Sequence, residues 1–342
     1  MIRRLCAPGL VSLLALAISS CVWTRDDLGW GTSATAAGSD TEATPARVTP
    51  VVRPLPTRRH GHRAHAIGGR LFVLGGNQSG TATRDLLEYD FDTEAWIPRA
   101  PMSTPKSFFG SAVVGGAIHA IGGGVIERYD AGDDRWTTVY SGTELPSSHF
   151  TAAAVADQIF ILGGFPTELG AMRVFDTSTG ALRRGISPPD HRPGDHFRFM
   201  AALCGELHVV GGYLEEATGG TTAHWSFDGE KWTERCPAPV ATAAKFAAWT
   251  VVDDRLVIFE QVQGFGIHHA YDPRLDAWTE LPAVEMLRAL PATVAIDGSL
   301  FVIGGFPTES AATVLRYDLE RRHWDAIANR PATLRGIGGD ES

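Results

Sequence analysis

The feature that most constrains this chain is a repeat of roughly 41–48 residues that recurs six times from about residue 48. Each repeat opens with an apolar run that ends in paired glycines, except in the fifth. The runs are LFVLGG (71–76), IHAIGG (118–123), IFILGG (159–164), LHVVGG (207–212), the degenerate LVIFEQ (256–261) and LFVIGG (300–305). Repeats of this length indicate a propeller or a solenoid, because each unit cannot bury its apolar face alone.

A second anchor follows each apolar run: an aromatic residue stands seven positions before another large residue. The pairs are Tyr89/Trp96, Tyr129/Trp136, Phe175/Leu182, Trp225/Trp232, Tyr271/Trp278 and Tyr317/Trp324. Aspartate follows the first aromatic in five units: Asp90, Asp130, Asp176, Asp272 and Asp318. The pattern predicts two strands joined by a turn that the aspartate caps. We expect the tryptophan to be a largely buried wedge between neighbouring units.

These two anchors together resemble the kelch repeat, and the resemblance covers residues 48–335, before a short tail at 336–342. It implies an all-β, six-bladed propeller with four antiparallel strands in each blade. The sequence departs from the pattern at the missing glycines of unit five, at Leu182, and at Ser226, which stands where aspartate is expected. Residues 48–57 look like the last strand of a repeat. We expect them to pair in the last blade and close the ring, although residues after Trp324 could instead re-enter the first blade.

The N-terminus reads as an export signal. Arg3 and Arg4 precede an apolar stretch too short to span a bilayer. Residues 18–21, Ile-Ser-Ser-Cys, resemble a bacterial lipobox, which implies a signal peptide at 1–20 and acylation of Cys21, although ordinary secretion is the alternative. Residues 21–47 are poor in aliphatic side chains, which predicts a flexible tether. We expect a lipid anchor in the bacterial envelope, at the outer membrane because Val22 is not aspartate.

Composition narrows the classes of partner. The formal charge is −9, a poor match to nucleic acid, and no CxxC spacing suggests a metal site. The segment RHGHRAH (59–65) holds three histidines, but alternation along a strand separates His65 from His60 and His62. We therefore predict no metal and no cofactor, and contact with a membrane only through the lipid.

Candidate ligand-binding residues follow from the topology of a blade. The loop between the second and third strands opens on the same side as the segment that leads into the next blade. The lead-in segments supply Arg59, His60, Lys106, His149, His196, Lys245 and Arg288. Such a ring would suit an anionic ligand such as a uronate, a sialate or another carboxylate. Alternatively, the arginines are structural donors to neighbouring loops.

The sequence GGFPTE occurs twice, at 163–168 and 304–309, in units that face each other across the axis. Phe165 and Phe306 could stack on a ligand while Glu168 and Glu309 bind hydroxyl groups or act as an acid and a base. The alternative is that both copies are turn sequences kept after duplication.

Two classes of function are therefore open. The first is a binding module for a protein or a carbohydrate, favoured by the tether and by the absence of a recognisable catalytic motif. The alternative is an enzyme similar to sialate mutarotases, which act on sugar acids with acid–base residues near the propeller axis. A copper enzyme similar to galactose oxidase does not fit, because four of the six tyrosines are repeat anchors.

Overall fold

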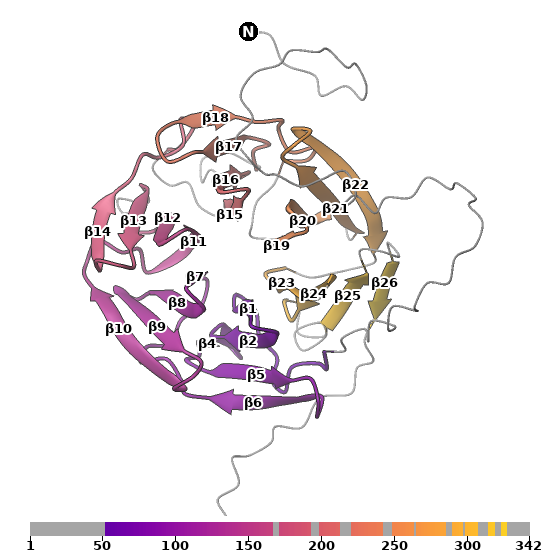
Figure 1. Ribbon diagram of the computed structural model, residues 1–342. Coiled ribbons are helices and arrows are strands. Elements are labelled where there is room, and N and C mark those ends of the chain that lie inside the picture. Colours follow the sequence, from indigo (N-terminus) through magenta and orange to yellow (C-terminus); the bar gives the residue numbers. More distant parts are fainter. Residues whose placement is uncertain are drawn as a thin grey trace, which may run out of the picture. The chain divides into compact units, whose positions relative to one another are not determined.

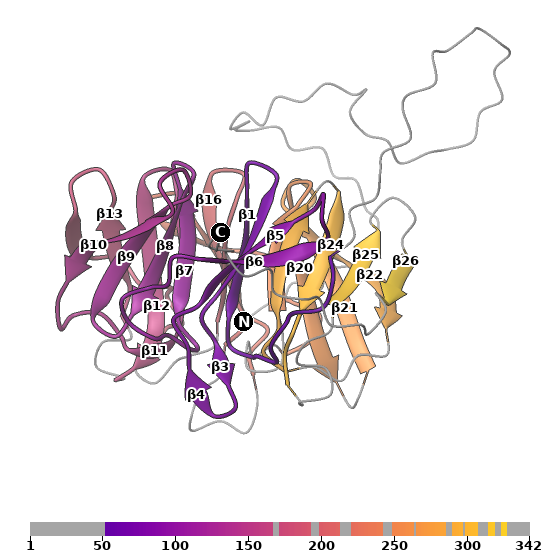
Figure 2. The same cartoon turned by 90° about the horizontal axis from the view of Figure 1, so that it is seen from below.

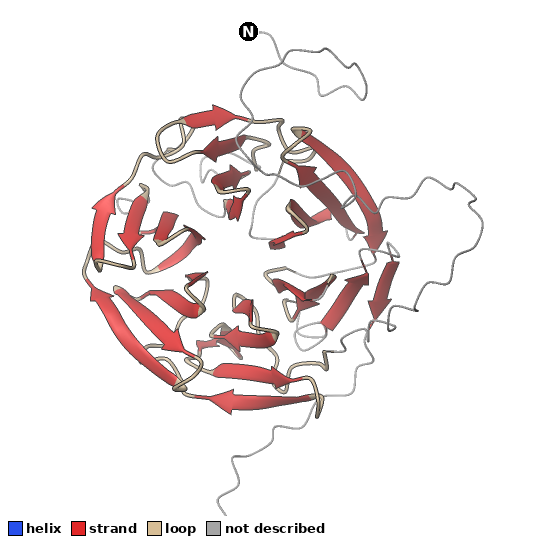
Figure 3. Cartoon of the chain, viewed as in Figure 1, coloured by secondary structure: helices blue, strands red, loops and turns tan. Residues whose placement is uncertain are grey.

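The computed structural model describes residues 52–166, 171–192, 198–212, 220–241, 248–262, 265–284, 289–296, 298–306, 314–318 and 323–326. Six four-stranded antiparallel sheets are arranged around a central axis as a β-propeller (Figure 1). Every element in Figure 3 is a strand, and in the part of the chain that is described no helix could cross a membrane. The predicted all-β, six-bladed fold is confirmed.

Each blade is one sequence repeat, and its strands follow one another from the axis outward. The innermost strands are β1 (Arg63–Ile67), β7 (Gly110–Val114), β11 (Ser148–Val155), β15 (Phe199–Leu203), β19 (Ala248–Val252) and β23 (Ala292–Ile296). The second strands are β2 (Arg70–Leu74), β8 (Ala117–Gly122), β12 (Gln158–Phe165), β16 (Glu206–Val210), β20 (Arg255–Val262) and β24 (Ser299–Ile303).

The third strands are β5 (Leu86–Asp90), β9 (Val125–Asp130), β13 (Arg173–Asp176), β17 (His224–Phe227), β21 (Phe265–Asp272) and β25 (Val314–Asp318). The outermost strands are β6 (Ala95–Arg99), β10 (Arg135–Ser141), β14 (Ala181–Arg184), β18 (Trp232–Glu234), β22 (Ala277–Val284) and β26 (His323–Ala326). A small hairpin, β3 (Asn77–Gln78) and β4 (Thr81–Ala82), projects beyond the first blade (Figure 2).

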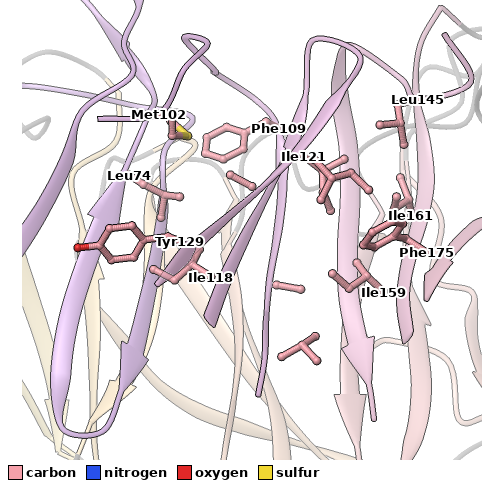
Figure 4. Packing of buried hydrophobic residues seen from close by; sticks show 14 of the residues in the cluster. Leu74, Met102, Phe109, Ile118, Ile121, Tyr129, Leu145, Ile159, Ile161 and Phe175 are labelled. Atoms are coloured by element: carbon pink, nitrogen blue, oxygen red, sulfur yellow. The ribbon is translucent and has the colours of Figure 1, made fainter. Parts of the chain in front are cut away.

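Apolar side chains fill every junction between neighbouring blades. The second strand of each blade is the most apolar; β2, for example, buries Leu71 through Leu74 completely. One cluster joins blades one, two and three, and Figure 4 shows Phe109, Ile118 and Ile161 within it. Other clusters join blades three and four, four and five, five and six, and six and one. The hydrophobic effect therefore acts around the whole ring rather than in one central core.

The repeated tryptophan makes a hydrogen bond that the sequence pattern did not predict. Its indole Nε1–H donates to a backbone carbonyl at or just after the outermost strand of the preceding blade. The pairs are Trp136 to Ala100 (2.8 Å), Trp232 to Ile186 (2.9 Å), Trp278 to Cys236 (2.9 Å) and Trp324 to Pro282 (3.1 Å). These four rings are partly buried and pack against the apolar clusters between blades, and among the repeated tryptophans Trp96 is fully buried.

At two junctions the tyrosine anchor completes this contact. Tyr129 Oη donates to Asp134 Oδ1 at 2.7 Å, and the same carboxylate accepts the Ala100 backbone N–H at 2.9 Å. Tyr271, Asp276 and Cys236 repeat the arrangement at 2.7 and 2.9 Å. Each linker residue is therefore bound through both its N–H and its carbonyl, which fixes the position of one blade against the next.

The expected role of residues 48–57 as a strand of the last blade was wrong. The sixth blade takes all four of its strands from β23–β26, and the described residues 52–57 form no strand. This segment instead lies on the first blade, where Trp96 Nε1 donates to the carbonyls of Arg53 and Pro54 at 3.0 and 3.1 Å. The segment supplies to Trp96 the carbonyl acceptors that the preceding blade supplies to the repeated tryptophan at other junctions. This shared role explains why the segment resembles the end of a repeat.

The pairing expected in unit four was also wrong. Trp232 lies opposite Phe227, whereas Trp225 lies opposite Glu234. The turn is two residues shorter than in the other units, and Asp228 caps it by accepting the N–H groups of Glu230 and Lys231 at 2.9 Å. Ser226 is therefore no departure from the pattern. Asp90, Asp130, Asp176 and Asp272 cap their turns as predicted, and the turn after Asp318 lies outside the described residues.

A buried histidine pair lies at the junction of blades four and five. His224 Nδ1 donates to the Cys236 carbonyl at 3.0 Å, because a carbonyl can only accept. The neutral His224 ring therefore accepts at Nε2, where His208 Nδ1 donates at 2.9 Å. Burial lowers the pKa of His208 to about 4 and that of His224 to about 3. Both rings are consequently neutral in the folded protein at neutral pH.

The indole hydrogen bond can be tested by removing only its donor. We expect Trp278→Phe to lower the free energy of unfolding by about 1 kcal/mol, the net value of one hydrogen bond, as measured by urea denaturation. Trp225→Phe is the control, because the buried Trp225 Nε1 has no hydrogen-bond partner among the residues that the structure describes. Its loss should cost nothing through hydrogen bonding. Equal destabilisation of both variants would show that ring packing alone matters.

The histidine pair predicts an acid-sensitive junction. Above about pH 6.5 these rings are neutral in both folded and unfolded chains, so they add no pH dependence. As the pH falls from 6.5 towards 4, only the unfolded chain binds protons, and each such histidine removes about 1.4 kcal/mol of stability per pH unit. In His208→Asn the amide can still donate to His224 but cannot titrate. Denaturation at several pH values should show a shallower loss in this variant, and an unchanged slope would contradict the assignment.

Candidate functional site

The innermost strands begin on one side of the propeller, the same side on which the second strands end. We call this side the loop face. On this side, one residue of each lead-in segment approaches the axis. It stands two positions before the innermost-strand residue that pairs with the last apolar residue of the second strand. In the described segments these residues are Gly61, Phe108, His149 and Leu290. All four have positive φ angles, between 52° and 62°. Non-glycine residues adopt such angles rarely, and often at functional sites.

These four residues are joined by a chain of backbone hydrogen bonds, which we call the collar. The Gly61 N–H donates to the Leu290 carbonyl at 3.1 Å, the Phe108 N–H to the Gly61 carbonyl at 2.9 Å, and the His149 N–H to the Phe108 carbonyl at 2.6 Å. The collar thus passes through blades six, one, two and three. It includes the junction at which the ring closes.

The paired glycines add a second set of bonds between blades. The Gly76 N–H donates to the Lys106 carbonyl at 2.8 Å, and the Gly305 N–H donates to the Arg59 carbonyl at 3.0 Å. A Cβ at Gly75 would lie 2.7 Å from the Lys106 carbonyl oxygen, and one at Gly76 would lie 2.7 Å from the His62 Cβ. Only glycine therefore allows the second strand to approach the next lead-in segment this closely.

Five rings lie in continuous contact along the loop face, and we call them the aromatic arc. In order they are Phe306, His60, Phe108, His149 and Phe165, with neighbouring centroids 4.9–5.7 Å apart. Phe108 and His149 are stacked at 10°, whereas His60 lies edge-on to Phe306. Each ring is at least partly exposed, and Phe306 is 51% exposed. The arc can therefore present π faces and edges to a ligand.

Four of the residues singled out from the sequence are thus brought together: His60, His149, Phe165 and Phe306. The two phenylalanines are the ends of the arc rather than a clamp by themselves, because His60, Phe108 and His149 connect them around one side of the axis. Phe108 was not among the residues singled out from the sequence pattern, and its neighbour Phe109 is fully buried. The available signal was its spacing, because Phe108 stands two residues before Gly110, where β7 begins.

Two of the predicted cations lie inside the protein. Arg59 is 1% exposed and donates to the Gly75 carbonyl at 3.2 Å and to Thr57 Oγ1 at 2.8 Å, with Asp85 3.5 Å away. Burial lowers the Arg59 pKa to about 10, although Asp85 opposes the shift. This is the structural role that the sequence analysis left open for these arginines.

Lys106 is 2% exposed, and its ammonium group forms an ion pair with Glu127. Burial alone would raise the pKa of the Glu127 carboxyl, but hydrogen bonds from Lys106 and Ser103 hold it below its ordinary value. The pair therefore ties the second lead-in segment to β9.

The other predicted site residues, His196, Lys245, Arg288, Glu168 and Glu309, lie outside the described residues, so their ligand-binding roles stay predictions. Within the described ranges, no group of three or more His, Cys, Asp or Glu residues is placed to hold a metal ion. In RHGHRAH, His60 belongs to the arc, His62 is completely buried, and His65 Nε2 lies 2.7 Å from Ser111 Oγ.

A small axial cavity of about 40 Å³ lies directly beneath the collar. It is lined by residues from all six blades: Gly61, Arg63, Phe108, His149, Phe150, Thr151, Arg198, Trp249, Leu290 and Pro291. Among the described residues, the lining contains two arginines and no carboxylate. A cavity of this size holds about three waters, or one small polar group of a larger ligand.

The fold and this loop face define a six-bladed β-propeller of tandem repeats. A model of the kelch motif matches residues 58–103 and 287–331, which are the first and sixth repeats. Kelch-like protein 36 of Bos taurus is 24% identical over 306 residues, covering 83% of this chain and 42% of that protein. Kelch-like protein 34 of Homo sapiens is 38% identical over 95 residues, which cover 27% of this chain and 14% of that protein.

The solved structure of YjhT superimposes with a TM-score of 0.64 at 12% identity, covering 80% of this chain and 99% of that one, and this likeness concerns the fold. Our chain spans about two fifths of the length of the first curated relatives it matches. The repeats, the blade topology and these matches together support a kelch-repeat family of β-propellers.

Proposed function

We propose that this chain is a binding module that presents its loop face to a protein or carbohydrate partner. The observation that carries the proposal is the aromatic arc. Its five rings come from four different blades and stay partly exposed, although most large apolar side chains of the described propeller are buried. Exposed aromatic rings of this kind are typical anchors of protein interfaces and also stack on sugar rings.

The kelch relatives favour a protein partner, because kelch propellers are typically protein-binding modules. The backbone geometry supports the same conclusion. Two of the five rings, Phe108 and His149, belong to residues with positive φ angles whose amides are fixed by the collar, so these rings are held in place before a partner arrives. A surface that is already ordered loses less entropy on binding.

We further propose that the protein is exported and held at the bacterial cell envelope, at the outer membrane, by a lipid on Cys21. The support is the order of features at the N-terminus: two arginines, a short apolar stretch, and Ile-Ser-Ser-Cys at 18–21. A tether at 22–47 would let the loop face reach a partner away from the membrane. The enzyme alternative depends on Glu168 and Glu309, which lie outside the described residues, and no described feature favours it.

Photo-crosslinking in cells that export the chain tests this proposal. A photoreactive phenylalanine analogue at position 306 should crosslink to a defined partner, and Phe306→Ser should abolish co-purification of that partner. The same analogue at Leu275, which is 74% exposed in a turn on the opposite face, is the control and should give no such product. Identical products from both positions, or none from position 306, would contradict a binding role for the loop face.

Fractionation of the same cells tests the anchor. The wild-type chain should partition into detergent with the outer membrane, and Cys21→Ser should release it into the soluble fraction. Membrane association that survives Cys21→Ser would show that Cys21 does not carry the anchor.

A further inference from the structure

Arg63 is placed unlike every other buried or half-buried cation of the described propeller. It begins β1 and lines the axial cavity beneath the collar. Its guanidinium carbon lies 5.9 Å from the centroid of Phe109, on the second blade, and 5.8 Å from that of Trp249, on the fifth. These distances are typical of cation–π contacts, so two rings from opposite sides of the axis flank the group.

The guanidinium of Arg63 has no hydrogen-bond acceptor and no carboxylate partner among the described residues. Burial lowers its pKa to about 10, and no acid group opposes that shift. Three other enclosed cations have a carboxylate partner: Lys106 is paired with Glu127, Arg59 with Asp85, and Arg198 with Asp190 through two contacts of 3.1 Å. A desolvated charge without a partner is costly to a protein.

The repeat pattern shows that the fold does not require an arginine here. Arg63 pairs with Leu74 across the first two strands, and the same pairing position in the other blades is occupied by small or apolar residues. These equivalents are Gly110, Thr151, Phe199, Ala248 and Ala292. Because five of the six equivalent positions carry no charge, the charge of Arg63 is not needed for the geometry of a blade.

The surroundings fit one planar anion. The cavity has a volume of about 40 Å³, and its described lining includes two arginines but no acidic residue. Arginine presents N–H groups in a plane that matches a carboxylate bidentately. The three heavy atoms of a carboxylate match the space for about three waters, whereas a tetrahedral phosphate with its substituent needs more.

We propose that Arg63 binds a carboxylate that a ligand inserts through the collar into the axial cavity. The inference rests on the proposed function, because the aromatic arc lies along one side of the collar and would hold the remainder of the ligand. The carboxylate could belong to an acidic side chain of a protein or to a sugar acid. In both cases its charge replaces the counter-ion that the described residues do not supply.

Titration of the purified full chain with sodium acetate tests the proposal. The indole N–H signal of Trp249, identified by its absence in Trp249→Phe, should shift saturably with acetate in nuclear magnetic resonance spectra. Acetamide, which has the same shape without the charge, and sodium chloride at equal ionic strength should not produce this shift. If acetate shifts the signal no more than acetamide does, the proposal is wrong.

Substitution of the arginine separates binding from structure. Arg63→Gln should weaken acetate binding at least about tenfold, and Arg63→Lys should weaken it less, because charge remains without the planar fork. Arg183→Gln removes an exposed arginine on β14 and should leave the affinity unchanged. The melting temperature of Arg63→Gln should be unchanged or higher, since the variant removes a half-buried charge that has no partner among the described residues. A lower melting temperature with unchanged acetate affinity would assign Arg63 a structural role and overturn the proposal.

The source of the carboxylate is settled by comparing N-acetylglutamate amide with glucuronate. The ligand that loses more affinity in Arg63→Gln identifies the class, and loss for neither would overturn the proposal. Failure of this inference is distinguishable from failure of the proposed function. A partner that is lost in Phe306→Ser but retained in Arg63→Gln would leave the binding face standing and remove only the carboxylate site.

Discussion

The structure depends on how the first blade is held to the sixth. A propeller is stable only if its ring is closed, and here no strand is shared between the ends of the chain in the described blades. Closure instead uses two backbone hydrogen bonds, from Gly61 to Leu290 and from Gly305 to Arg59, above an apolar cluster that includes Phe301 and Trp96. The same kinds of bond recur between blades one and two, so the closing junction is built like an internal one.

Because the collar closes the ring, it also determines the site. The amide-to-carbonyl chain requires positive φ angles at Gly61, Phe108, His149 and Leu290, and this backbone conformation directs the side chains of Phe108 and His149 into mutual stacking. Gly61 must stay small, since a Cβ there would lie 2.9 Å from the Phe108 ring. The strained backbone that holds the blades together therefore also orders the surface that we propose for binding.

Much of the fold could be predicted from the sequence, because its determinants are side chains at fixed spacing. Paired glycines and the aspartate-capped turns identify the strands. The seven-residue spacing predicted the wrong pair in unit four, because the turn there is two residues shorter and Phe227 rather than Trp225 lies opposite Trp232. The role of residues 52–57 was misjudged for a related reason: they supply a carbonyl to Trp96, and the resemblance to a strand did not reveal that use.

The site was less predictable, for physical reasons. Backbone hydrogen bonds such as those of the collar leave no side-chain signature. Arg59 and Lys106 were expected at the surface because long cations usually are, and their partners Asp85 and Glu127 lie on segments that only the fold brings near. Arg63 has no distinguishing signal within RHGHRAH, because the two rings that flank it, Phe109 and Trp249, are brought near it only by the fold.

Amide hydrogen exchange of the collar tests this account most directly. If the collar closes the ring, the Gly61 N–H should exchange only through global unfolding, with the same free energy as the amide of Val73 within β2. The Gly68 amide, in an exposed turn, should exchange far faster. A Gly61 amide that exchanges as fast as that of Gly68, while Val73 stays protected, would show that blades one and six separate freely and would contradict closure by the collar.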